Sequence, residues 1–186
     1  DIVCLTGKAF TCRSKLQRAV FDEDVPLPRE LLDNDILIHV GPIVLRKEEN
    51  YRLVSFMPTS SVRFEKWGSR SIRDWGLKVI VGKTTMGDQT AKTMAELGCV
   101  HLSPRSVSPN LWVKSIKVES VFLFDEMGSI EAPWQLSVNE LGPFVVDIDT
   151  HGGRLYKELQ SSVQQRLSDA YRRLKIPDDF RYTKLQ

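Results

Sequence analysis

Two short apolar segments, each ended by a glycine, constrain the possible folds of this chain more than any other feature. Residues 36–40 (Ile-Leu-Ile-His-Val) stop at Gly41, and residues 78–81 (Lys-Val-Ile-Val) stop at Gly82. The first segment predicts a strong strand, and the second is a short apolar run typical of a buried strand. The second segment is followed by a loop and by apolar residues at helical spacing over residues 89–97. This part of the chain therefore predicts a strand–loop–helix unit.

The remaining segments predict a mixture of strands and helices. We expect a strand pair or strand–turn over 1–11, a short helix over 12–21, a hairpin from 43–45 and 51–54, a helix starting at 62–67, and strands over 113–121 and 144–148. Apolar residues spaced by three and four from Leu155 to Leu174 predict one long amphipathic helix over about 153–175, which Pro177 ends. The elements together predict an α/β (mixed α+β) sheet layered with helices.

Length and composition indicate an ordinary globular chain and exclude several classes of protein. With 186 residues, 41% of them hydrophobic and 27% charged, we predict a single domain over 1–186, with a core over about 1–153 and a C-terminal helix and tail over about 153–186. A net charge of +2 without a concentrated basic face predicts no nucleic-acid partner. No segment approaches the roughly 20 apolar residues that cross a membrane.

The cysteines and histidines predict no metal site built by this chain alone. Three cysteines without a CxxC pair form a poor disulfide framework and a poor zinc site, and the three histidines have no ligand spacing: Cys4, Cys12, Cys99, His39, His101 and His151. We expect reduced thiols and a cytoplasmic protein. The chain opens at Asp1 inside a predicted strand, so we expect the natural N-terminus to lie upstream.

Polar groups concentrate where strands end or helices start, over residues 11–13, 58–63, 82–87 and 147–153. The third place is not a P-loop, because that motif needs four residues before Gly-Lys-Ser/Thr, whereas the five residues between Gly76 and Gly82 form the predicted strand. A glycine-rich loop with Lys83 before a helix still suits an anion. A plain turn with a solvent-exposed lysine fits equally well.

Arg13, Arg63 and Lys83 are ordinary surface cations when taken singly. As a set they would hold a dianion such as a dicarboxylate, because the guanidinium fork matches a carboxylate in a bidentate manner. Thr59 and the two serines after it fit a helix cap better than a nucleophile, and Glu65 suits a capping box.

Polar residues alternate at the end of the predicted strand over 144–148 and just beyond it. Asp147, Asp149 and His151 would share one face if the strand ran on through them. A hydrogen-bonded structural cluster at the strand end is the favoured interpretation.

In order and spacing, these segments resemble the C-terminal domain of class I fumarases and the β subunit of L-tartrate dehydratase. The matching stretches are Leu5-Thr6-Gly7 through Cys12-Arg13, His39-Val40-Gly41-Pro42, Pro58-Thr59-Ser60 through Arg63, Val81-Gly82-Lys83 with Met86-Gly87, and Leu141-Gly142-Pro143 with Asp149-Thr150-His151-Gly152. Each stretch is short, but the ordered set is specific and covers the chain to about residue 153.

The resemblance implies a swivelling β/β/α domain and the reversible addition or removal of water on a four-carbon dicarboxylate. It also implies a partner α subunit, in an α2β2 assembly, that holds a 4Fe-4S cluster through three cysteines. By motif, Arg13, Arg63 and Lys83 correspond to ligands of the substrate carboxylates, and Thr59 to the base that handles the carbon-bound proton. The opposing acid and the cluster ligands would lie in the partner.

Two departures from the family pattern bear on the substrate. Ser14 and Gln17 stand where family members commonly have Asp and His, and Thr84-Thr85 interrupts a loop that often reads Gly-Lys-Gly-Gly-Met. We expect fumarate and malate as the substrate pair, with tartrate or a methylated dicarboxylate as the alternative.

Two further classes of function stay open. One is a non-catalytic relative that binds a carboxylate or scaffolds a partner, and a co-purifying cluster-bearing subunit would argue against it. The other is an independent hydrolase that uses Thr59 or Ser60 with His151, which would be active without iron.

Overall fold

The computed structural model describes residues 1–48, 50–105, 108–177 and 179–181, and the chain divides into two compact units, 1–153 and 154–186. The strands of the first unit are β1 (Ile2–Cys12), β2 (Ile36–His39), β3 (Ile43–Lys47), β4 (Asn50–Ser55), β5 (Val79–Val81), β6 (Val100–Pro104), β7 (Ile116–Val121) and β8 (Trp134–Ile148). Its helices are α1 (Ser14–Asp22), α2 (Glu65–Trp75), α3 (Asp88–Leu97) and α4 (Phe124–Met127), with 3-10 helices η1 (Arg29–Leu31), η2 (Ser61–Phe64) and η3 (Val113–Ser115). The predicted mixed α+β class is confirmed.

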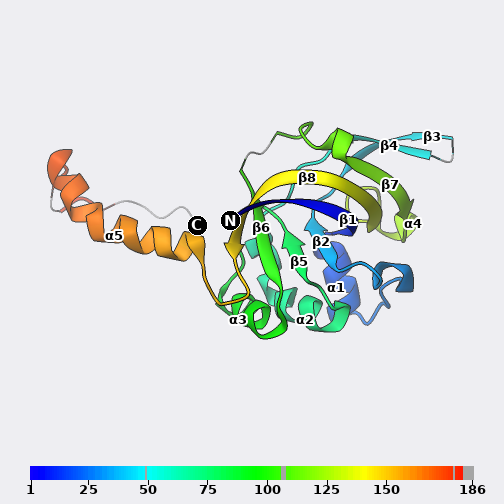
Figure 1. Cartoon of the computed structure of the whole chain (residues 1–186), viewed down its shortest axis with the longest axis horizontal. Helices are drawn as coiled ribbons and strands as arrows, with labels where there is room; N and C mark the ends of the chain where they lie inside the picture. Colours follow the sequence, from blue (N-terminus) through cyan, green and yellow to red (C-terminus); the bar gives the residue numbers. More distant parts are fainter. Residues whose placement is uncertain (49, 106–107, 178, 182–186) are drawn as a thin grey trace. The chain divides into compact units, whose positions relative to one another are not determined.

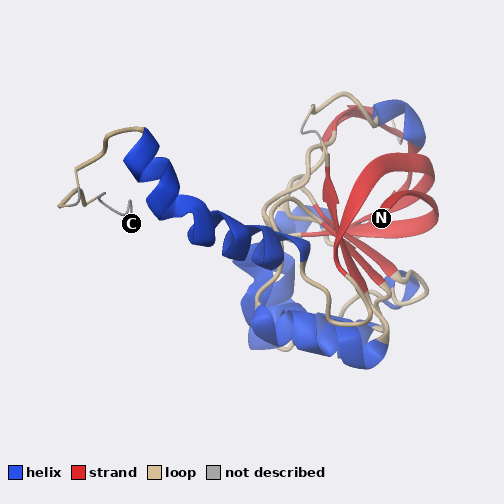
Figure 2. Ribbon diagram, turned by 60° about the vertical axis from the view of Figure 1, so that its left-hand side comes forward, coloured by secondary structure: helices blue, strands red, loops and turns tan. Residues whose placement is uncertain are grey.

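The main sheet of the first unit closes on itself. Its strand order is β1-β2-β5-β6-β8-β7, and β8 also pairs with β1. The strands β1, β2, β5 and β6 are parallel neighbours, whereas β8 runs antiparallel to β6, β1 and β7. Figure 2 shows the strongly curved strands that make this closure possible. Because the four central strands are parallel, their carboxyl ends meet at one end of the sheet.

Both faces of the parallel strands are covered by hydrophobic side chains. Along β2, Ile36 and Ile38 belong to a cluster inside the closed sheet, whereas Leu37 belongs to a second cluster under the helices. The second cluster includes Trp75 of α2 and Met94 of α3. Figure 1 shows α1, α2 and α3 together on one side of the sheet. Burial on two faces explains why residues 36–38 are wholly apolar.

Several elements differ from the sequence predictions. The segment 1–11 is one strand rather than a strand pair, because β1 absorbs two register shifts between Val3 and Gly7 instead of turning back. The predicted strand over 144–148 is the end of the much longer β8, and β6 was not predicted. The helix expected at 62–67 begins as η2 and continues through α2 to Trp75. The strand predicted over 113–121 begins only at Ile116, after η3.

The second unit consists mainly of the predicted long helix, α5 (Leu155–Arg173). Large apolar side chains of this unit are exposed within it, including Leu159, Val163 and Leu174. Among the residues that the structure describes, no helix has both the length and the apolarity needed to cross a membrane.

Candidate active site

Residues 58–61 extend the sheet at the carboxyl ends of β2 and β5. The Thr59 N–H donates to the carbonyl of His39 at 2.6 Å, and the Lys83 N–H donates to the carbonyl of Thr59 at 3.0 Å. The Ser61 N–H in turn donates to the carbonyl of Lys83 at 2.8 Å. Backbone pairing therefore makes the candidate base Thr59 and the candidate carboxylate ligand Lys83 direct neighbours.

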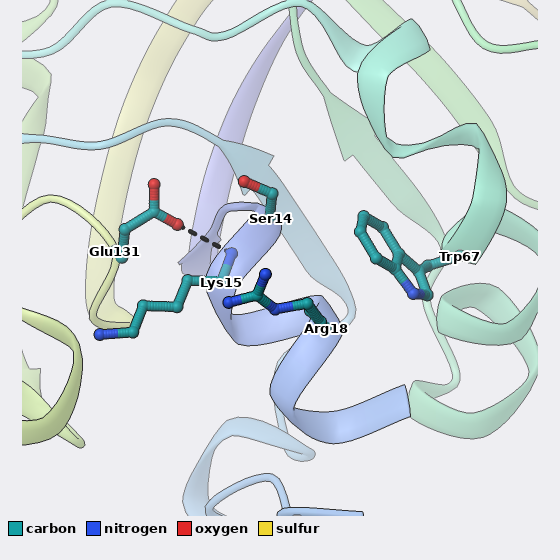
Figure 3. A pocket seen from close by; sticks show the side chains of 5 residues that line it. All are labelled: Ser14, Lys15, Arg18, Trp67 and Glu131. Carbon is teal, nitrogen blue, oxygen red and sulfur yellow. Dashed lines mark hydrogen bonds between the residues drawn. The ribbon is translucent and has the colours of Figure 1, made fainter. Parts of the chain in front are cut away.

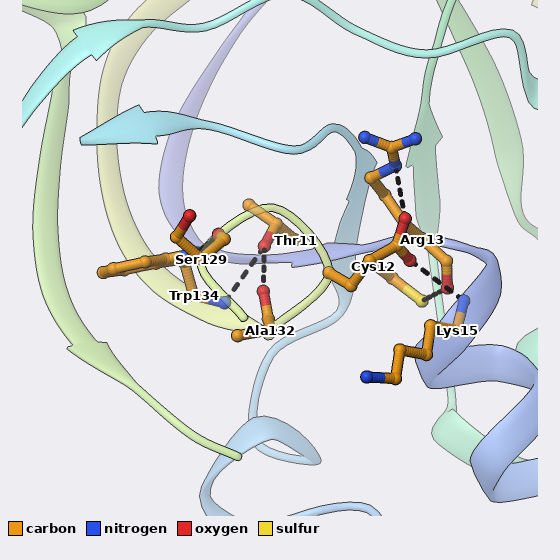
Figure 4. Close-up of polar contacts among 8 residues, drawn as sticks. Thr11, Cys12, Arg13, Lys15, Ser129, Ala132 and Trp134 are labelled. Atoms are coloured by element: carbon orange, nitrogen blue, oxygen red, sulfur yellow. Dashed lines mark hydrogen bonds and ion pairs between the residues drawn. The ribbon is translucent and has the colours of Figure 1, made fainter. Parts of the chain in front are cut away.

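Arg13 follows the last residue of β1 and lies against the turn that follows β2. A Cβ atom placed on Gly41 would lie 2.8 Å from the Arg13 Nη1, so the glycine leaves room for the guanidinium. The Nε of Arg13 forms an ion pair with Glu131 Oε1 at 3.2 Å, and both side chains are about three-quarters buried. Figure 4 shows that Arg13 and Lys15 point to different sides of the chain. Arg13 thus lies at the same end of the sheet as Thr59 and Lys83.

Arg63 lies in η2, directly after the segment 58–61, and its side chain is exposed. Its backbone N–H donates to the carbonyl of Ser60 at 3.3 Å. In the described part of the chain, no hydrogen bond or ion pair links the side chains of Arg13, Thr59, Arg63 and Lys83 to one another. The structure brings the backbones of Thr59 and Lys83 together and places the two arginines at elements that adjoin them.

Carboxylates of the protein itself accept N–H groups at the starts of α1 and α3, at this end of the sheet. Glu65 in α2 accepts the N–H groups of Gly87 at 2.6 Å and of Thr90 at 3.1 Å, at the start of α3. Glu131 accepts the N–H of Lys15 at 2.9 Å, at the start of α1. A helix N-terminus attracts anions through its dipole and its free N–H groups. At α1 and α3, part of that attraction is therefore already used by carboxylates of the chain itself.

These contacts correct the capping predictions. Glu65 does not complete a capping box with the residues before it, because its side chain reaches across to α3 instead. The residue at the N-cap of η2 is Ser60, which makes no side-chain capping bond, so Thr59 caps no helix here. The start of α3, which the sequence offered to a ligand anion, is taken by Glu65.

A cluster of four buried polar side chains lies beneath the Thr59–Lys83 pairing. We call Asp147, His101, Ser61 and His39 the buried polar cluster; each is at most 1% exposed. Its hydrogen bonds join His101 Nδ1 to Asp147 Oδ1 at 2.6 Å, His101 Nε2 to Ser61 Oγ at 2.8 Å and His39 Nδ1 to Ser61 Oγ at 2.9 Å. Sequence spacing gave no signal for this cluster, because its members lie on three different strands and on η2.

The predicted face of Asp147, Asp149 and His151 is not formed. Asp147 lies in β8, whereas Asp149 and His151 belong to the turn after β8 ends at Ile148. There the Asp149 Oδ1 accepts the N–H groups of Gly153 and His151, each at 2.8 Å. These hydrogen bonds lower the pKa of Asp149 below its usual value, and the bond from Gly153 has the largest effect.

The cysteines of this chain do not form a metal site. Burial raises the pKa of the Cys12 thiol well above its usual value and that of Cys99 to about 12, whereas Cys4 is exposed. Deprotonated thiolates are the form that binds metals. Within the described residues, no group of three or more His, Cys, Asp or Glu side chains could hold a metal ion.

A pocket of about 280 Å³ lies beside α1, lined by Ser14, Lys15, Arg18, Trp67 and Glu131 (Figure 3). None of the four predicted site residues lines it. One of its polar residues already has partners within the chain, because Glu131 accepts the N–H of Lys15 and forms the ion pair with Arg13.

The structure does not support an independent hydrolase. His151 is exposed and, in the described residues, makes no hydrogen bond to Thr59 or Ser60. Ser61, His101 and Asp147 do have the order of a hydrolase triad, but the side chain of Ser61 is fully buried, so no substrate reaches it.

Comparisons with known proteins agree with the resemblance seen in the sequence. Residues 1–159 match the family described as fumarase C-terminus. The chain is 33% identical over 173 residues to a Methanocaldococcus jannaschii protein provisionally assigned as L(+)-tartrate dehydratase subunit beta. This match covers 91% of this chain and 88% of that protein. It is 32% identical over 167 residues to the L(+)-tartrate dehydratase subunit beta of Escherichia coli, covering 89% and 82% of the two chains. A provisionally assigned class I fumarate hydratase of Geobacillus stearothermophilus is 31% identical over 170 residues, but only 32% of its length is covered.

Replacing Glu65 should release the start of α3. Glu65→Ala removes the acceptor of two backbone N–H groups, so we expect a loss of about 1 kcal/mol in the free energy of unfolding. Glu65→Gln keeps one oxygen acceptor and should lose less. Urea unfolding measures both. As the control, Glu96→Ala near the end of α3 removes only exposed ion pairs and should change little. Equal losses for Glu65→Ala and Glu96→Ala would contradict the capping role.

His39 should make the stability of the chain depend on pH. Burial, with a smaller contribution from nearby His101, lowers the pKa of His39 from 6.5 to about 3. Between these values the unfolded chain binds a proton that the folded chain does not, so the free energy of unfolding should fall as pH falls, by up to about 1.4 kcal/mol per pH unit from this group. His39→Asn keeps a donor for Ser61 but has no such proton, so its profile should be flatter. Urea unfolding across this pH range tests the difference, and parallel profiles would refute it.

Proposed function

Since this chain belongs to the fumarase C-terminus family, we propose that it is the β subunit of a hydro-lyase that reversibly adds water to a four-carbon dicarboxylate. The observation that carries the proposal is the meeting of Thr59 and Lys83 by backbone pairing, with Arg13 at the same end of the parallel strands. A set of cations around one hydroxyl is what proton removal from a dicarboxylate needs. A non-catalytic relative that binds a carboxylate would use the cations, but it would leave the Thr59 hydroxyl without a role.

Arg13, Arg63 and Lys83 bind the two carboxylates of the substrate in this proposal. Glu131 and Glu65 already accept N–H groups at the starts of α1 and α3, so in this proposal side chains supply the positive charge. Arg13 is held in place by its ion pair with Glu131. A guanidinium that is already oriented loses less conformational entropy when it binds a carboxylate.

Thr59 receives the carbon-bound proton in this proposal. A threonine hydroxyl is a weak base at its ordinary pKa, so it needs nearby positive charge to stabilise the alkoxide form. Lys83 is its backbone neighbour, and the cations that bind the substrate would supply the same field. Because Thr59 caps no helix, its hydroxyl is not engaged in a structural role of that kind.

The 4Fe-4S cluster implied by the family does not fit the residues of this chain. Two of its three cysteines are buried with raised pKa values, and the described residues contain no group that could hold a metal ion. We assign the cluster to a partner α subunit, in a hetero-oligomer of the α2β2 type. The names of the relatives, which call them β subunits, support a partner.

Fumarate and malate are the substrate pair that we propose first, and tartrate is the second candidate. The names of the relatives favour the second, because the tartrate dehydratase β subunits match over 82–88% of their lengths, whereas the fumarate hydratase is a much longer chain. The cations and the hydroxyl serve either substrate. A methylated dicarboxylate fits the same charge pattern.

The complex with its partner should be active and the isolated chain should not. We expect the chain alone to be colourless, iron-free and inactive, because its cysteines cannot hold a cluster. Anaerobic coexpression with a cluster-bearing α subunit should give a coloured complex that hydrates fumarate or dehydrates tartrate. The visible spectrum and assays on both substrates test this. Turnover by the chain alone after reconstitution with iron and sulfide would disprove the subunit role, and a stable but inactive complex would favour a scaffold.

Substitutions in the complex should separate binding from proton transfer. Arg13→Ala, Arg63→Ala and Lys83→Met each remove a charge-assisted hydrogen bond of roughly 1.5–3 kcal/mol, so kcat/KM should fall about 10- to 150-fold. Thr59→Ala should lower kcat by about 10²–10⁴-fold, and Thr59→Ser, which keeps the hydroxyl, should retain part of it. Arg73→Ala, an exposed arginine of α2, is the control and should match the wild type. A Thr59→Ala complex within about threefold of wild-type kcat would end the base hypothesis.

A further inference from the structure

The hydroxyl of Ser61 lies where a side chain of Gly82 would otherwise be. A Cβ atom placed on Gly82 would lie only 2.0 Å from Ser61 Oγ and 3.3 Å from His39 Cβ. Gly82 follows β5, which lies between β2 and β6 in the sheet. The hydroxyl therefore lies over the middle strand and bonds to His39 of β2 on one side and to His101 of β6 on the other.

The chemistry of the buried polar cluster orders its protons. A carboxylate at Asp147 accepts from the Nδ1–H of His101, which leaves His101 Nε2 as an acceptor for the hydroxyl of Ser61. The oxygen of Ser61 then accepts from the Nδ1–H of His39. In this order the buried His39 Nε2, which has no partner in the described residues, carries no proton. In the reverse order, Ser61 would donate to His39 Nδ1, and the buried His39 Nε2 would carry a proton without an acceptor. A buried N–H without an acceptor is rarer in proteins than a buried acceptor without a donor.

The backbone of Ser61 connects this cluster to the candidate site. Its N–H donates to the carbonyl of Lys83, while the N–H of Lys83 donates to the carbonyl of Thr59. The ring of His39 also stacks on Phe64 of η2, with ring centroids 4.2 Å apart. The side chain of Ser61 is thus fixed from below by two strands, and its backbone is paired with the segment that carries the candidate ligand.

We propose that the buried polar cluster is a positioning device, in which the Ser61 hydroxyl sets the position of Thr59 relative to Lys83. A purely apolar side chain at this place would fill the space without fixing the orientation of residue 61, whereas the three hydrogen bonds of the cluster fix that orientation. His39, Ser61, His101 and Asp147 are positioning residues, since each is buried and none touches substrate. The inference rests on the proposed function, because the spacing of Thr59 and Lys83 matters for rate only there.

Ser61→Ala and Ser71→Ala form a matched pair of variants. Both serines are fully buried, and Ser71 accepts a hydrogen bond from the Gln17 side chain at 3.0 Å, away from the residue 58–61 segment. In the coexpressed complex, Ser61→Ala should lower kcat by about 10²-fold, the effect of a misplaced reacting group. Ser71→Ala should stay within about threefold of wild-type kcat, even where the two variants lose similar thermal stability.

A double-mutant cycle with Thr59→Ala distinguishes positioning from general damage. If the cluster acts through Thr59, adding Ser61→Ala to Thr59→Ala should lower kcat by less than about threefold more. Full additivity of the two losses would overturn the proposal, and so would a Ser61→Ala complex as fast as wild type.

Amide hydrogen exchange on the full chain tests the positioning without any enzyme assay. The N–H groups of Thr59, Ser61 and Lys83 should exchange about tenfold faster or more in Ser61→Ala, and at the wild-type rate in Ser71→Ala. Unchanged exchange at these amides in Ser61→Ala would overturn the proposal. If the complex acts on no four-carbon dicarboxylate, the proposed function fails, and the exchange rates alone then decide whether the cluster holds Thr59 and Lys83 together.

Discussion

The pairing of β8 with both β1 and β6 is the constraint on which the rest of this structure depends. β8 runs antiparallel to β1 over Ile2–Phe10 and to β6 at its own end, so the parallel strands close into a ring rather than spreading as an open sheet. Trp134, Leu136 and Phe144 of β8 are fully buried inside that ring. Once the ring is closed, the loops after β1, β2 and β5 must meet at one end. The candidate site therefore follows from topology, without side-chain contacts between its members.

Local patterns in the sequence predicted elements well where one rule of burial or periodicity was sufficient. Residues 36–40 predicted a strand, residues 78–81 predicted a buried strand, and the spacing from Leu155 onward predicted α5. The middle of β8 was missed, because Asn139, Gly142 and Pro143 are residues typical of a turn. In the structure they stay in one strand. The register shift between Val3 and Leu5 of β1 accommodates Gly142 and Pro143, and the shift between Leu5 and Gly7 accommodates Asn139. Pairing between distant segments decided the outcome there, and no local pattern contains that information.

The candidate site, like the strands and helices, was predictable from the sequence only in part. The sequence marked Thr59 and Lys83 as polar positions at strand ends, and the family resemblance suggested roles for them, but their backbone pairing became visible only with the sheet order. The buried polar cluster could not be found from spacing, because its hydrogen bonds join residues 22, 40 and 46 positions apart. Sequence reasoning grouped Asp147 with Asp149 and His151 by alternation. That grouping fails because β8 ends at Ile148.

The reach of Glu65 from α2 to the start of α3 couples two helices that are formed by separate segments. The first N–H groups of α3 find their acceptor only when α2 is docked beside it, and Arg73 of α2 also pairs with Glu96 of α3. Neither helix can fray at this point without exposing unsatisfied groups of the other. The two helices should consequently open and close as one cooperative unit. The loop from Lys83 to Gly87 would then share the lifetime of that unit, not that of an independent surface loop.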